Sequence, residues 1–166
     1  DRNLLLNVTK KDLPRKGKSR KRKYRRVTRR IRDIEAKRID DRPEGAKGRS
    51  EYGHWEMDCI ESGRGKGRAC LLVLVERMSR ETLIFKLRSQ TQKEVQRQLD
   101  LYERKIGYKG FREKFKTITV DNGSEFLDWR GLERSCANED GLPRTQVYYC
   151  HPYHAWERGS NEQVNG

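Results

Sequence analysis

Apolar and polar residues alternate along the first part of the chain that has a globular pattern. Over residues 54–60, "HWEMDCI", every second side chain is apolar, which predicts a strand with one face turned to a core. The segment "ACLLVLVERM", 69–78, is almost continuously apolar, as is typical of a strand buried on both faces. A third strand, "ETLIFKLR", spans 81–88. Because short loops join these segments, we predict three consecutive antiparallel strands.

The period then changes to that of a helix. In residues 91–107, apolar side chains recur at steps of four, three and four, which places them on one face of an amphipathic helix. Thr91, with Glu94 three residues later, predicts a capping box, and Gly107 is a helix-ending residue. The remaining predicted elements are a strand at 115–120, a short helix at 129–138, a strand at 144–150 and a last helix that begins at Ser160.

The order of these elements predicts the fold class. Three antiparallel strands, followed by strands that alternate with helices, are typical of an α/β fold whose mixed five-stranded sheet is flanked by helices.

The N-terminal end of the chain is strongly basic. The 166 residues include 39 Lys and Arg against 25 Asp and Glu, a formal net charge of +14, and 14 of the 23 residues from Lys10 to Arg32 are basic. Such a block repels itself and buries little, so we expect an extended arm that neutralises DNA phosphates rather than a mere solubility tail. The expected contact residues are Arg20, Lys21, Arg22, Lys23, Arg25, Arg26, Arg29 and Arg30.

The arm and the globular pattern divide the chain. Residues 40–53 have the Pro, Gly and charged composition of a linker, so we assign residues 1–50 to a basic DNA-binding arm and linker and 51–166 to a core. No apolar run approaches a membrane span and no signal peptide is visible, which predicts a soluble cytoplasmic protein. A zinc site drawn from Cys150, His151 and His154 matches no standard spacing, and we disfavour it.

Two aspartates lie on the first and fourth predicted strands, which sheets of this kind put side by side. Asp58 is on the polar side of the first strand, and Asp121 ends the fourth strand, just before the Asn-Gly turn of "TITVDNGSEF". If these strands are neighbours, the two carboxylates repel each other, and a hard divalent cation such as Mg²⁺ or Mn²⁺ relieves that repulsion. Glu125 follows the turn, and we expect it to be a solvated residue rather than an acid that supports the site.

Three blocks of sequence resemble the catalytic core of the DDE transposases, most closely the bacterial insertion-sequence family numbered thirty, a relative of the retroviral integrases. They are "GHWEMD" at 53–58, "TVDNGSEF" at 119–126 and "HPYHAWERGSNEQVNG" at 151–166. The resemblance implies an RNase H-like fold and a site for two Mg²⁺ or Mn²⁺ ions. Asp58, Asp121 and Glu162 then hold the metals and are the catalytic residues.

Two glutamates, Glu157 and Glu162, are candidates for the third metal-binding acid. Glu157 lies closer to the spacing of retroviral integrases, but Glu162 matches the Asn-Glu pair of the resembling family and falls inside the predicted last helix. We therefore prefer Glu162. Trp156 and Arg158, just before that helix, are candidate DNA contacts by stacking and by phosphate binding, with burial of Trp156 as its alternative. For His54 and His151 we expect structural roles.

The resemblance also implies a function. It is that of a transposase that cleaves and transfers DNA strands at transposon ends, acts on target DNA, and assembles as a homodimer or higher oligomer on DNA in the bacterial cytoplasm, in association with the nucleoid. The alternative is an inactive DNA-binding or architectural protein with an RNase H-like core, and a nuclease acting on RNA–DNA hybrids is less consistent with the basic arm. Nothing in the chain resembles the family's N-terminal helix-turn-helix domain, and we expect the last helix to be truncated at Gly166.

Overall fold

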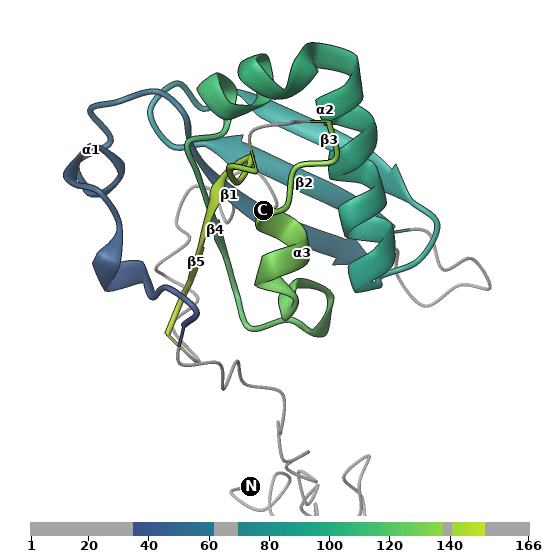
Figure 1. Cartoon of the computed structure of the whole chain (residues 1–166). Coiled ribbons are helices and arrows are strands. Elements are labelled where there is room, and N and C mark those ends of the chain that lie inside the picture. Colours follow the sequence, from purple (N-terminus) through teal and green to yellow (C-terminus); the bar gives the residue numbers. More distant parts are fainter. Residues whose placement is uncertain (1–34, 62–69, 138–140, 152–166) are drawn as a thin grey trace, which may run out of the picture.

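The computed structural model describes residues 35–61, 70–137 and 141–151. The strands form one mixed sheet in the order β3-β2-β1-β4-β5, in which β1 pairs antiparallel with β2 and parallel with β4 (Figure 1). The predicted mixed five-stranded sheet is therefore confirmed. The elements are η1 (Ile39–Asp41), α1 (Glu44–Lys47), β1 (His54–Glu61), β2 (Cys70–Glu76), β3 (Thr82–Leu87), α2 (Gln92–Lys114), β4 (Thr117–Val120), η2 (Ser124–Phe126), α3 (Trp129–Glu133) and β5 (Gln146–Tyr149).

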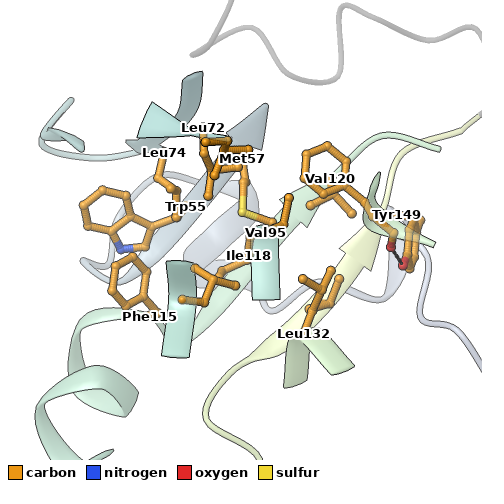
Figure 2. Packing of buried hydrophobic residues seen from close by; sticks show 14 of the residues in the cluster. Trp55, Met57, Leu72, Leu74, Val95, Phe115, Ile118, Val120, Leu132 and Tyr149 are labelled. Atoms are coloured by element: carbon orange, nitrogen blue, oxygen red, sulfur yellow. Dashed lines mark hydrogen bonds between the residues drawn. The ribbon is translucent and has the colours of Figure 1, made fainter. Parts of the chain in front are cut away.

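One face of the sheet carries the apolar core. The alternation in β1 puts Trp55 and Met57 on this face, where both are fully buried among residues of the neighbouring strands and of α2 and α3. Figure 2 shows the indole of Trp55 above the ring of Phe115, with ring centroids 4.9 Å apart. The indole N–H of Trp55 donates to the Lys114 carbonyl at 2.7 Å, so this large side chain is buried without an unpaired polar atom.

Helix α2 crosses the apolar face of the sheet (Figure 1). Thr91 caps it as predicted, because its side chain accepts from the backbone N–H of Glu94. The carboxylate of Glu94 completes no capping box; it accepts instead from the backbone of Arg88 and the side chain of Arg97. Gly107, with φ +78°, ends the first helical segment as predicted, and a second segment continues in a new direction to Lys114.

The opposite face of the sheet is polar and is partly covered by the segment before β1. Arg42 donates to the Thr119 hydroxyl at 3.2 Å, and the Arg77 side chain donates to the Ala46 carbonyl at 3.1 Å. Ala46 is fully buried. The described part of the segment that we interpreted as a linker thus packs on the sheet, where its sequence composition gave no sign of burial.

Beneath this segment lies a buried ion pair between Arg77 and Glu56, in which the carboxylate is fully buried. We predict that Arg77→Met lowers the free energy of unfolding by about 3–5 kcal/mol, because the Glu56 carboxylate then loses its cation in a buried position. Urea denaturation measures the loss. In the matched control Arg104→Met, at an exposed position of α2, the change should stay within about 0.5 kcal/mol. Equal losses in the two variants would contradict the importance of the buried pair.

Candidate metal-dependent active site

The register of β1 against β4 indicates a common location for the two candidate aspartates. His54 pairs with Thr117 and Glu56 with Thr119 in the parallel ladder. Paired residues share a face, since the His54 ring lies 2.8 Å from the Thr117 hydroxyl. Continued by two residues, the same register places Asp58 beside Asp121, immediately after the last residue of β4.

Each aspartate is oriented by a local backbone contact. Oδ1 of Asp58 accepts from the backbone N–H of Cys59 at 2.9 Å, and Oδ1 of Asp121 accepts from that of Gly123 at 2.8 Å. Both side chains are half-buried. Two carboxylates held in this way on adjacent strands present hard oxygen atoms of the kind that Mg²⁺ and Mn²⁺ prefer.

The turn after Asp121 needs its glycine for space rather than for an unusual backbone angle. Gly123 has φ −60°, which any residue adopts. A methyl group at this position, however, would lie 2.8 Å from Oδ1 of Asp121 and 2.9 Å from Oε2 of Glu125. The Asn122 amide donates to the Cys150 carbonyl at 2.9 Å and ties the turn to the end of β5. The turn thus lets two carboxylates approach the same small space beside the sheet.

Glu125 is the residue for which the sequence interpretation was wrong. We expected a solvated side chain, but Glu125 is only 7% exposed, and its Oε1 accepts from the Gln90 amide at 2.6 Å. Glu125 belongs to η2, and its side chain is buried because η2 packs against α2. No periodic signal in the sequence distinguishes a buried acid in so short a turn from an exposed one.

The surroundings of the aspartates include two cysteines on the apolar side of β1 and β2. Burial is the main cause that raises the pKa of the Cys59 thiol, and Cys70 and the carboxylates of Glu125 and Asp58 raise it further. Burial also raises the pKa of Cys70. Because both groups stay neutral thiols, they act as small apolar residues, and the oxygen atoms remain the candidate metal ligands.

A second acidic group in the described part of the chain has a different explanation. Asp100 and Glu103 of α2 lie with Cys136 in an arrangement that could hold a metal ion. The guanidinium of Arg144, itself fully buried, already bonds both carboxylates, at 2.5 Å to Asp100 and 3.2 Å to Glu103. Ser135 and the backbone of Cys136 donate to Glu103 as well. This network joins α2 to the connection between α3 and β5, and we interpret it as structural.

The two histidines that the structure describes, His54 and His151, have partners of their own. His54 is 2% exposed, and its second ring nitrogen lies 3.2 Å from Glu51, which fits the structural role that we expected. His151 follows β5 and lies 3.1 Å from an oxygen of Asp40 in η1. Several predicted site residues lie outside the described residues: Glu162, Glu157, Trp156, Arg158, His154 and the arm residues Arg20, Lys21, Arg22, Lys23, Arg25, Arg26, Arg29 and Arg30.

Comparison with known proteins places these features in a family. The model of the integrase core domain matches residues 48–141. A probable transposase for insertion-like sequence element IS1161 from Streptococcus salivarius is 33% identical over 98% of this chain and 42% of its own length. Transposase InsI for insertion sequence element IS30C from Escherichia coli (strain K12) is 31% identical over 77% of this chain and 30% of its own length. The chain thus spans less than half the length of these two relatives.

Solved structures support the fold. A chain in the cryoEM structure of a simian T-cell lymphotropic virus intasome, in complex with PP2A regulatory subunit B56 gamma, superposes with a TM-score of 0.52 at 19% identity, over 68% of this chain and 37% of its own. The RNase H-like fold predicted from the sequence is therefore confirmed. Among the described helices, none is long and apolar enough to cross a membrane.

Proposed function

The chain belongs to the integrase core domain family, and from that membership we propose that it is the catalytic core of a transposase. It would cut DNA at the ends of a transposable element and join those ends to target DNA. The observation that carries the proposal is the β1–β4 register, which supports a carboxylate pair formed by Asp58 and Asp121. Transposases among the relatives add to this support.

In this proposal, Asp58, Asp121 and Glu162 hold two divalent cations, Mg²⁺ or Mn²⁺. When bound, the cations would stabilise the attacking and leaving oxygens of an in-line displacement at phosphorus. The chain's own contribution is rigidity, because β1 and the end of β4 fix two of the carboxylates before DNA arrives. The turn at Gly123 leaves the space beside Asp121 uncovered by a side chain of its own.

The proposed reaction has two steps of the same kind. In the first, water attacks a phosphodiester at the transposon end, a P–O bond forms, and the 3′ oxygen leaves as a free hydroxyl. In the second, that 3′-hydroxyl attacks a phosphodiester of target DNA. A new P–O bond joins the transposon 3′ end to the target 5′ phosphate, and the target's own 3′ oxygen leaves as a hydroxyl, with the proton lost by the attacking group balancing the one it gains. Neither step needs a covalent protein–DNA intermediate. The partners are therefore double-stranded transposon ends and target DNA, and we propose that the chain acts in the cytoplasm as a dimer or higher oligomer on DNA.

A cleavage assay tests the proposal directly. The 166-residue chain is incubated with labelled duplexes that carry the ends of its transposable element, with Mg²⁺, with Mn²⁺, or with a chelator. We expect strand cleavage that requires the divalent cation. DNA binding without cleavage under every metal condition would favour instead an inactive DNA-binding protein with the same core.

The third acid can be assigned in the same assay. We predict that Glu162→Gln reduces cleavage by about a thousandfold or more, as for loss of a ligand that contributes several kcal/mol to the transition state. Glu157→Gln should cost less than about tenfold, because Glu157 precedes the predicted cap of the last helix at Ser160 and is less rigidly aimed. The reverse ranking of the two variants would move the third ligand to Glu157.

A further inference from the structure

Two glutamines at the start of α2 hold the loop that follows Asp121. Gln90 and Gln92 flank the capping residue Thr91, and their side-chain amides point to the same loop. The Gln90 amide donates to Oε1 of Glu125 at 2.6 Å, and the Gln92 amide donates to the Ser124 carbonyl at 2.8 Å. The position of Glu125 is thus fixed by a helix end that lies outside the β1–β4 pair.

Glu125 differs from the other buried glutamates of the described residues. Four of these form ion pairs, namely Glu56 with Arg77, Glu94 with Arg97, Glu103 with Arg144 and Glu133 with Lys37. A fifth, Glu76, accepts from the backbone N–H groups of Gly53, His54, Met78 and Ser79. In each case, the buried negative charge is neutralised or surrounded by several donors.

The charge of Glu125 has no such compensation in the described part of the chain. No Lys or Arg there forms an ion pair with it, and its neutral partners are Gln90 and, at 3.4 Å, the Ser124 hydroxyl. Burial of an ionised carboxylate is costly unless a cation or several donors stabilise it. A second carboxylate nearby, Asp121, makes that cost larger.

The orientation of the Glu125 carboxylate indicates where a cation could balance its negative charge. Oε1 accepts the short bond from Gln90, whereas Oε2, which accepts only the long bond from the Ser124 hydroxyl, faces the space above Gly123 that Oδ1 of Asp121 also borders. Asp58 lies on β1 two residues after Glu56, and Asp121 lies two residues after its partner Thr119. One oxygen of Glu125 is therefore held by Gln90, and the other is turned toward Asp121.

We propose that Glu125 is a fourth acid of the metal site, held by Gln90, and that its Oε2 strengthens the binding of a hard divalent cation beside Asp121. This inference rests on the proposed function, since it assigns a further residue to the same site. Glu125 would approach the cation from the start of α2, where Gln90 holds it, and not from β1, which carries Asp58. Its negative charge raises the affinity of the site for Mg²⁺ or Mn²⁺ before any DNA is bound.

Metal binding without DNA tests the assignment. Calorimetric titration with Mn²⁺ alone compares the wild-type chain with Glu125→Gln, which keeps the shape of the side chain and removes its charge. We expect the dissociation constant to rise roughly tenfold or more, the range found for groups that support metal ligands. The melting temperature without metal should stay the same or rise, because a buried charge next to Asp121 is gone.

Control variants separate a metal role from a structural one. Glu113→Gln removes a charge from an exposed position of α2 and should leave Mn²⁺ affinity unchanged. Gln90→Ala keeps the Glu125 carboxylate but releases its anchor, so it should weaken Mn²⁺ binding by a smaller factor than Glu125→Gln. A lower metal-free melting temperature with unchanged Mn²⁺ affinity in Glu125→Gln would overturn the inference and make Glu125 a structural residue.

The titration also distinguishes this inference from the proposed function. If Asp58→Asn weakens Mn²⁺ binding and Glu125→Gln does not, Glu125 is not part of the site, and the function of the aspartates stands. If neither variant changes Mn²⁺ binding, the metal site itself is wrong, and both proposals fail.

Discussion

Replacement of Asp58 or Asp121 with asparagine is expected to lower metal-dependent DNA cleavage by about a thousandfold or more. Each substitution removes one charged oxygen ligand, and a metal contributes several kcal/mol of charge stabilisation at the transition state. Every 1.36 kcal/mol of lost stabilisation corresponds to about a factor of ten in rate. The strands themselves should be little affected, because asparagine has the same shape and can still accept the backbone hydrogen bonds seen at Cys59 and Gly123.

Single-turnover cleavage of labelled duplex, with enzyme in excess, measures this effect without interference from product release. Binding of the same duplex should be unchanged or tighter, since each variant removes negative charge near the phosphates. Glu61→Gln is the matched control, because Glu61 is exposed at the end of the same strand as Asp58 and should cleave like the wild type. A near wild-type rate in either aspartate variant would exclude that residue as a metal ligand.

The sequence predicted those features of the fold that depend on neighbouring residues. The alternation over residues 54–60 predicted which face of β1 carries Trp55, and the capping residue Thr91 marked the start of α2. Both signals arise from side chains a few residues apart, which one strand or one helical turn brings together. The placement of Asp58 and Asp121 on one face followed from the same periodicity, once the strand order was assumed.

The features that sequence analysis missed depend on residues far apart in the chain. Arg42 and Thr119 are separated by 77 residues, and nothing in the composition of the supposed linker predicts that Arg42 packs on the sheet. Arg144 lies 44 residues from Asp100, and Gln90 lies 35 from Glu125. A charged or amide side chain in a loop has no periodicity that reveals its partner, so burial of such groups became visible only with the tertiary structure.

The described segment before β1 sets the boundary for a deletion of the basic arm. The carbonyl of Lys37 accepts from the backbone N–H of Tyr149 at 3.0 Å, its ammonium lies 3.2 Å from Glu133, and Ile39 is buried. Residues 35–50 therefore belong with the sheet for purposes of truncation. Deletion of residues 1–34 leaves these contacts in place and removes the basic block between Lys10 and Arg32.

This deletion should weaken DNA binding strongly and almost equally for unrelated sequences, because contacts between basic side chains and phosphates carry no base information. If six cations of the arm engage phosphates, the slope of log affinity against log salt concentration should fall by about five, at ~0.9 per phosphate neutralised. Salt titrations of binding for the full and truncated chains on several duplexes measure that slope.

Deletion of residues 1–9 is the matched control, since that stretch contains Arg2 and Asp1 but none of the basic block. The slope for this control should match that of the full chain. Cleavage of saturating DNA should change little, because no proposed metal ligand lies in the arm. An unchanged slope after deletion of residues 1–34 would mean that the arm contributes no phosphate contacts, and the core alone would then have to bind the DNA.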